Sequence, residues 1–159
     1  MYFLIGRQRV QENRALCPRT AAVLDAIPRI HGMAMFSALL PNGQIASHCG
    51  PSNTKLTIHL GLVVPPGCGM RVSREARSWE EGKCLVFDDS FEHESWNRSS
   101  STRFILFLDI WHPDLSDVEI DLLSEIQDIF TEEDHVQDLH RIRAAREQER
   151  GHAWWPTGR

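Results

Sequence analysis

Short apolar or alternating runs, separated by turn-forming residues, fill the middle of the chain from Met33 to about Ile110. They are MAMFSALL, KLTIHLGLVV, GMRVS, ARSW, KCLVF, HESWN and RFILFLDI. The triplets Pro-Asn-Gly, Pro-Pro-Gly and Glu-Glu-Gly interrupt them, and these residues favour turns. Several short strands at this spacing predict an all-β sandwich or barrel. A parallel sheet is disfavoured because no intervening segment is long enough for a crossover helix.

Alternation along two of these runs separates an apolar face from a mixed face. In KLTIHLGLVV the four apolar positions from Leu56 to Leu62 share one face, and the polar residues share the other. In RFILFLDI the same period gives one face all apolar residues. The opposite face carries Arg103, Ile105, Phe107 and Asp109. A polar face on a sheet usually meets water, whereas in a closed barrel it lines a cavity.

A helix is predicted on the N-terminal side of this β-core, which we place at about residues 33–113. The run AAVLDAI follows Thr20, a residue that favours the N-cap position, and Pro28 ends the pattern. We therefore expect one short N-terminal helix ahead of the strands.

The C-terminal part also has a helical pattern. Apolar residues recur at helical spacing after Pro113, and Ser116 with Glu119 forms a capping-box sequence. A second, charged helix is predicted over about 132–150. We expect a single domain spanning residues 1–159, whose helical extension covers about 114–150.

Composition excludes several classes of protein. The 159 residues include 17 Lys and Arg against 22 Asp and Glu, which gives a net charge of −5. A general nucleic-acid or anionic-membrane binder would need a basic face. No apolar run approaches the roughly 18 residues of a membrane span. The four cysteines form no Cys-x-x-Cys pair, so free thiols and a cytoplasmic protein are expected.

Two histidines and one arginine form the most informative pattern. His48 ends a predicted strand, His93 follows 45 positions later, and Arg103 lies ten residues beyond it. This order is typical of non-haem iron oxygenases built on a double-stranded β-helix. Neutral imidazole is a good Fe(II) ligand, and a buried guanidinium can pair with the far carboxylate of a 2-keto diacid.

Longer segments resemble the aspartyl/asparaginyl β-hydroxylase family, a branch of the Fe(II)- and 2-oxoglutarate-dependent dioxygenases. They are FSALLPNG, HCGPSNTKLTIHLGLVVP, EARSWEEGKCLVFDDSFEHE and TRFILFLDIWHPDL, in the family's order. The resemblance implies a double-stranded β-helix, a jelly-roll and cupin-like fold. It also implies that 2-oxoglutarate and O2 are consumed, with succinate and CO2 as co-products.

The resemblance assigns roles to individual residues. His48 and His93 match the two iron ligands, which makes them the catalytic metal site. Arg103 matches the residue that binds the distal carboxylate of 2-oxoglutarate, and His59 and Ser37 match further contacts to that cosubstrate. Gly50, two residues after His48, stands where most of the wider superfamily carries an Asp or Glu ligand. This family similarly lacks that ligand, so two protein side chains would hold the iron.

Substrate contacts are less clearly marked. Members that act on acidic peptide side chains often carry Arg at the position of Thr57, and Lys55 is the nearest residue that offers a charge. Trp96 is a candidate wall of the substrate pocket. One of Asp88 and Asp89 could orient a ligand imidazole, and a role in the turn explains the pair equally well.

The predicted function is hydroxylation of an amino-acid or peptidyl side chain by Fe(II), 2-oxoglutarate and O2. The open position at Gly50 leaves desaturation, cyclisation or halogenation of a small amino-acid-derived substrate as an alternative. A cupin-like metal-binding module without oxygenase activity is a second alternative, and a scaffold acting through the C-terminal helices is a third. The expected partner is a small molecule or peptide, with no nucleic acid and no membrane. Substrate identity and oligomeric state are not predicted.

Overall fold

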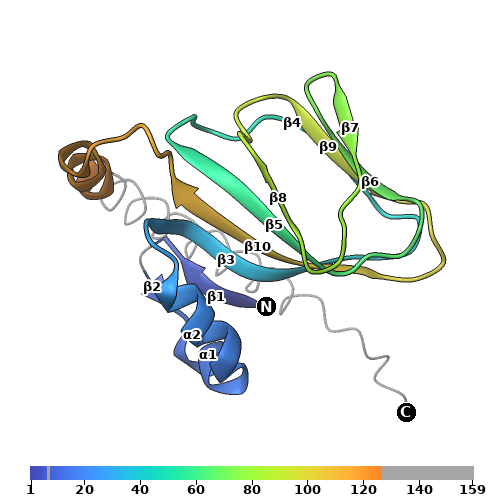
Figure 1. The fold of residues 1–159 in the computed structure, drawn as a ribbon, viewed down its shortest axis with the longest axis horizontal. Helices are drawn as coiled ribbons and strands as arrows, with labels where there is room; N and C mark the ends of the chain where they lie inside the picture. Colours follow the sequence, from blue (N-terminus) through green and yellow to red (C-terminus); the bar gives the residue numbers. More distant parts are fainter. Residues whose placement is uncertain (7, 127–159) are drawn as a thin grey trace, which may run out of the picture. The chain divides into compact units, whose positions relative to one another are not determined.

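The computed structural model describes residues 1–6 and 8–126, which form two antiparallel sheets (Figure 1). The six-stranded sheet has the order β2-β1-β3-β10-β5-β8, and the four-stranded sheet has the order β4-β9-β6-β7. The strands of the first sheet are β1 (Tyr2–Ile5), β2 (Gln8–Arg9), β3 (Ile30–Leu39), β5 (Lys55–Val63), β8 (Cys84–Phe87) and β10 (Arg103–Trp111). Those of the second are β4 (Gln44–His48), β6 (Cys68–Val72), β7 (Glu75–Arg77) and β9 (His93–Asn97).

The two sheets pack face to face through a buried apolar cluster. Cys68 and Met70 come from the four-stranded sheet, Ile105 comes from the six-stranded sheet, and Trp79 joins them from the segment after β7. Facing antiparallel sheets whose strands cross between layers are the double-stranded β-helix, or jelly roll. The predicted mainly-β, cupin-like fold class is therefore confirmed.

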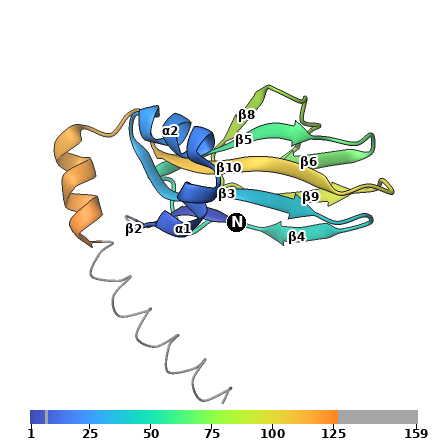
Figure 2. The same cartoon turned by 90° about the horizontal axis from the view of Figure 1, so that it is seen from below.

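Two short helices cover the outer face of the six-stranded sheet, on the side away from the four-stranded sheet (Figures 1 and 2). They are α1 (Gln11–Leu16) and α2 (Pro18–Ala26). Leu24 of α2 packs with Phe3 of β1 and with Leu106 and Leu108 of β10. Burial of these side chains holds the helices against the outer face of the six-stranded sheet. The inner face of that sheet lines the space between the two sheets.

The N-terminal part differs from the sequence prediction in three ways. One helix was predicted and two are present, and α2 begins at Pro18, so the expected N-cap at Thr20 is wrong. Proline suits the first helical turn because that position needs no N–H donor. The β-core also begins earlier than residue 33, because β1 pairs with β3 and extends the sheet. Contacts distant in sequence decide this pairing.

The C-terminal part follows the prediction as far as it is described. A helix covers residues 117–126, beginning directly after Ser116. The chain divides into two compact units, Met1–Ser116 and Asp117–Arg159. The predicted helix over about 132–150 lies outside the described residues. Among the described residues, no helix has the length and apolar character needed to span a bilayer.

Candidate functional site

The central strands β5 and β10 place polar side chains between the two sheets, which is one of the two arrangements that the alternation left open. Thr57 and His59 of β5 and Arg103 and Asp109 of β10 are all buried on this inner face. Their neighbours along each strand pack under the helices instead. The mixed face therefore lines an interior, and does not meet water.

The predicted iron ligands meet across a strand pair. β4 pairs with β9, and His48 stands opposite His93, with ring centroids 4.2 Å apart. Each ring contacts a backbone carbonyl through Nδ1 at 2.8 Å, His48 to Ala46 and His93 to Phe91. Because an Nδ1–H that donates to a carbonyl leaves Nε2 with a free lone pair, both rings are prepared to bind a metal.

Two histidines are the whole ligand set that the described part of the chain offers here. No group of three or more His, Cys, Asp or Glu side chains within residues 1–6 and 8–126 has metal-binding geometry. This agrees with the absence of a carboxylate ligand at Gly50. A metal held by two imidazoles would retain open positions for exogenous ligands.

Arg103 is a buried cation without a carboxylate partner. Its side chain is 1% exposed, and Nε has no hydrogen-bond partner. One terminal nitrogen donates to Ser37 Oγ at 3.3 Å, and the guanidinium lies 4.7 Å from the centre of the Trp79 ring. Burial lowers the pKa of Arg103 from its ordinary value. Such a group is costly to bury unless an anion pairs with it, so the geometry fits a bound carboxylate.

His59 lies beside Arg103 as a neutral imidazole. Burial, followed by the positive charge of Arg103, lowers the pKa of His59 to about 3. Trp79 Nε1 donates to His59 Nδ1 at 3.2 Å, which leaves Nε2 as a buried nitrogen without a partner. Since Nδ1 accepts this bond, the proton is on Nε2 and is available to a ligand. Arg103 and His59 thus both present unused donors between the sheets.

A second group of charges joins β5 and β10 to the segment that lies next to Gly50. Lys55 Nζ donates to Asp89 Oδ2 at 2.9 Å and to Asp109 Oδ2 at 3.1 Å, and Thr57 Oγ1 donates to Asp109 Oδ1 at 2.8 Å. Burial by itself lowers the pKa of Lys55, but the charges of Asp109 and Asp89 outweigh burial and raise it above the ordinary value. Burial raises the pKa of Asp109. Because Lys55 is bound to Asp89 and Asp109, its ammonium group is not free to bind a substrate.

The absence of a side chain at Gly50 leaves room for the carboxylate of Asp89. A Cβ atom at Gly50 would lie 2.5 Å from the carboxyl carbon of Asp89, so any side chain there would displace that carboxylate. The backbone N–H of Gly50 also donates to the Asp89 carbonyl at 2.7 Å. Asp89 Oδ1 is buried without a partner. The space next to Gly50 is therefore taken up by the carboxylate of Asp89, which comes from the segment between β8 and β9.

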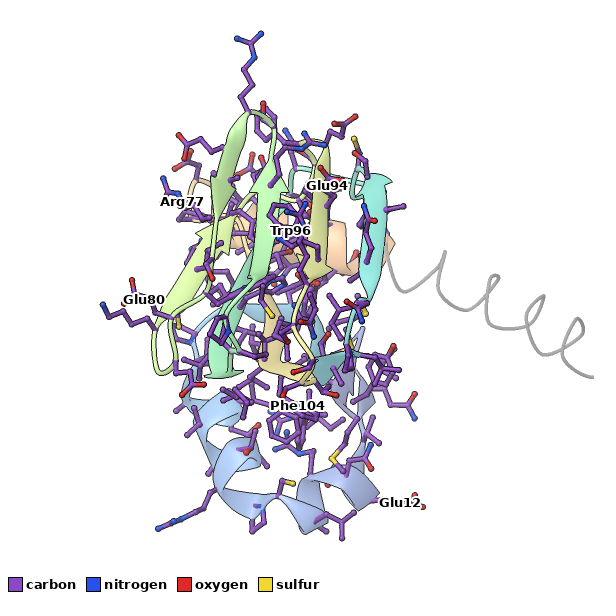
Figure 3. All side chains as sticks on the ribbon, turned by 90° about the vertical axis from the view of Figure 1, so that its right-hand side faces the viewer. Glu12, Arg77, Glu80, Glu94, Trp96 and Phe104 are labelled. Atoms are coloured by element: carbon purple, nitrogen blue, oxygen red, sulfur yellow. The ribbon has the colours of Figure 1, made fainter. Side chains whose placement is uncertain are left out.

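The predicted substrate residues are less well placed than the ligands. Lys55 and Thr57 face the interior, but their polar groups bond Asp89 and Asp109. Trp96 lies on the outer face of the four-stranded sheet, where Figure 3 shows it near Glu94. A Cβ at Gly69 would come 2.6 Å from the Trp96 ring, which lies across that glycine. Strand alternation thus turns Trp96 away from the side of β9 that carries His93.

A family model described as aspartyl/asparaginyl beta-hydroxylase matches residues 1–113. The chain belongs to this family. Aspartyl/asparaginyl beta-hydroxylase of Mus musculus is 43% identical over 117 residues, which are 69% of this chain and 16% of that protein. The ornithine lipid ester-linked acyl 2-hydroxylase of Rhizobium tropici is 40% identical over 116 residues, which are 70% of this chain and 41% of that protein. The names of both relatives describe hydroxylases.

Coverage limits what these relatives say about the whole protein. The aligned segment spans less than half of each relative named above. Among solved structures, the Schizosaccharomyces pombe Cnp3 cupin domain aligns over 54% of this chain and 58% of that one, with 8% identity and a TM-score of 0.44. The two named hydroxylases differ in the compound their names describe, so family membership alone leaves the substrate open.

Two features of the site were missing from the sequence prediction. Trp79 contacts both Arg103 and His59, and no local pattern in the sequence indicated these two partners. The Lys55–Asp89–Asp109 network joins residues from three separate segments. The sequence shows the charge of each of these residues, but the charge alone does not predict which residues pair.

Proposed function

We propose that this protein is an Fe(II)- and 2-oxoglutarate-dependent dioxygenase that hydroxylates a C–H bond of an amino-acid-derived substrate. One observation carries the proposal. His48 and His93 stand opposite each other with metal-ready rings, His93 partly buried and His48 exposed, and the buried guanidinium of Arg103 has no anionic partner among the described residues. Chelation of a keto diacid by iron requires such a histidine pair and such a cation. Family membership supports it independently.

His48 and His93 would hold the metal through Nε2. Their Nδ1 contacts with the carbonyls of Ala46 and Phe91 orient the rings and keep the basic nitrogen free. When bound, Fe(II) with 2-oxoglutarate and O2 supplies C–H oxidation, with succinate and CO2 as co-products.

Arg103, His59 and Ser37 would fix the cosubstrate. The guanidinium would pair with the far carboxylate of 2-oxoglutarate, and the neutral His59 would donate from Nε2. Trp79 is a positioning residue, because it holds His59 through Nδ1 and supports the plane of Arg103. The apolar residues Ile105 and Phe107 exclude water around these groups.

Asp89 would act beside the metal without binding it. Its carboxylate is held against Gly50 by Lys55, and its free Oδ1 would be available to accept a hydrogen bond from a ligand bound at the site. The same arrangement leaves the third protein-ligand position open, so desaturation, cyclisation or halogenation remains an alternative outcome of the same site. The mass of the product distinguishes these outcomes from hydroxylation.

The test needs no substrate. Under argon, Fe(II) followed by 2-oxoglutarate is expected to give the weak visible charge-transfer band of a keto acid chelated to ferrous iron. The band should vanish in His93→Ala and need more 2-oxoglutarate in Arg103→Ala. His112→Ala is the matched control, since the His112 ring makes its polar contacts within residues 1–6 and 8–126 with Asp114 alone, at the carboxylate and at the backbone N–H.

The opposite result has a clear meaning. If the folded parent binds iron and shows no band, the oxygenase mechanism is wrong, and a cupin-like metal-binding module takes its place. If His112→Ala loses the band as fully as His93→Ala, the histidine pair is not the metal site.

A further inference from the structure

A cavity of about 430 Å³ opens between the edges of the two sheets. One side is β8, the last strand of the six-stranded sheet, and the other side is β6 with β7, the last strands of the four-stranded sheet. Its volume lies within the range of about 300–1,000 Å³ typical of small-molecule sites. The cavity is therefore large enough for a ligand, and it lies where the barrel is not closed by strand pairing.

The inner wall of this cavity is apolar. It consists of Met70 and Val72 from β6 and Leu85 and Phe87 from β8. All four belong to the cluster packed between the sheets, so the wall continues into the interior of the barrel. A charged or strongly polar group placed against this wall would lose its hydration without gaining a partner.

Two residues that line the cavity, Val72 and Phe87, adjoin His93. The rings of Phe87 and His93 have centroids 5.5 Å apart, and Val72 is the cross-strand neighbour of His93. Phe91, whose carbonyl contacts His93 Nδ1, places its side chain at the mouth, where it is 56% exposed. A chain that follows this wall inward therefore arrives beside a proposed metal ligand.

The mouth of the cavity is cationic. Arg74 and Arg77 lie there with Glu75, and Arg77 is paired with Glu75 at 2.7 Å. Arg74 has no hydrogen bond or ion pair with any residue in 1–6 or 8–126. One uncompensated positive charge thus stands at the entrance of an apolar channel.

We propose that this cavity binds the aliphatic chain of a single-chain anionic amphiphile, with the anionic group at Arg74 and the chain along Phe87. This assignment rests on the proposed function, and it names the substrate class of that site. The chain carbon that reaches His93 is the one oxidised: one oxygen atom of O2 enters its C–H bond, and the other enters succinate as 2-oxoglutarate loses CO2. An acidic peptide side chain fits less well because Lys55 is already bound by Asp89 and Asp109.

Calorimetric titration with decanoate tests the assignment, with decylammonium as the probe of opposite charge. We expect decanoate to bind the parent and Phe91→Ala to weaken that binding by about fivefold or more, because aromatic area leaves the mouth. Phe91→Ala leaves the carbonyl that contacts His93 in place. Phe104→Ala is the matched control, since Phe104 is 41% exposed and lies outside the cavity.

The charge at the mouth is tested separately. Arg74→Gln should weaken decanoate binding by about threefold to tenfold at low salt and leave decylammonium no weaker. Arg19→Gln, an exposed arginine of α2, should change neither. Absence of decanoate binding to the parent, or equal binding by the parent and Phe91→Ala, overturns the proposal.

A second readout keeps this inference separate from the proposed function. Mn(II) in place of Fe(II) should broaden the proton signals at the methyl end of bound decanoate more than those beside its carboxylate, and His93→Ala should remove the effect. If the charge-transfer band forms while decanoate does not bind, the dioxygenase stands and the substrate class is wrong. If decanoate binds and no band forms, the dioxygenase mechanism is wrong, and so is the assignment of decanoate as its substrate.

Discussion

Strands β5 and β10 carry an apolar face that packs under the helices and an inner face that buries polar groups between the two sheets. On one face Leu106 and Leu108 pack with Leu24 of α2 and bury only carbon. On the other face Arg103 and Asp109 are equally buried, and Arg103 Nε has no partner. The apolar face stabilises the fold, whereas the inner face costs stability because it keeps polar groups ready for a ligand.

The largest effect is expected from a cavity on the apolar face. Leu106→Ala should lower the free energy of unfolding by about 2–4 kcal/mol, because Leu106 is 5% exposed within the cluster under α2. Affinity for 2-oxoglutarate should not change. Urea unfolding and anaerobic cosubstrate titration measure the two quantities. Phe104→Ala on the same strand, at an exposed position, should cost clearly less; an equal cost would contradict the comparison.

The corresponding change on the inner face should have the opposite sign. Arg103→Met removes a buried, unpaired charge, so the ligand-free protein should gain about 1–2 kcal/mol of stability. 2-Oxoglutarate should raise the melting temperature of the parent and not that of Arg103→Met. Arg103→Lys, which keeps a charge, should show no gain. If Arg103→Met destabilises as much as Leu106→Ala, the inner face is an ordinary core.

The contact between Gly50 and Asp89 predicts a coupling. Gly50→Ala should cost about 1–2 kcal/mol, because its Cβ would overlap the Asp89 carboxylate that Lys55 holds. In Asp89→Ala the same glycine substitution should cost much less, which a double-mutant cycle in urea measures. Additive effects would show that Gly50 serves another purpose. Gly50→Asp should not supply a third metal ligand while Asp89 is present.

The smallest effect concerns pH. The pKa of Lys55 is raised above its unfolded value, so its charge contributes stability below about pH 10.5, and this contribution is lost as pH rises through the folded pKa. The stability difference between the parent and Lys55→Met should therefore be constant from about pH 8 to about pH 10 and shrink above it. The difference should persist in high salt because the ion pairs are largely buried. A difference that grows at alkaline pH would contradict this sign.

Much of the site could be predicted because it depends on local rules. A period of two along KLTIHLGLVV and RFILFLDI assigned His59 and Arg103 to one side of the sheet, and the structure places both there. The order of His48, His93 and Arg103, with the surrounding segments, indicated the family that the comparison confirms. The roles of these residues toward iron and 2-oxoglutarate stay predictions until the binding experiments are made.

Other features depended on contacts that no local rule contains. The start of α2 at Pro18 and the pairing of β1 with β3 were missed, because tertiary packing outweighs the weak local preferences of the first thirty residues. Trp96 was expected at the pocket. Alternation puts Trp96 on the same strand face as Glu94, but only the packing of the two sheets shows that this is the outer face.

The sequence by itself determined which side chains share a strand face, because alternation is a property of the extended backbone. The tertiary structure alone decided which faces meet. It brought His48 to His93 across 45 positions, joined Lys55 to Asp89 and Asp109, and opened an apolar cavity between β7 and β8. These outcomes follow from how two sheets close on one another, and that closure is fixed by burial summed over the whole fold.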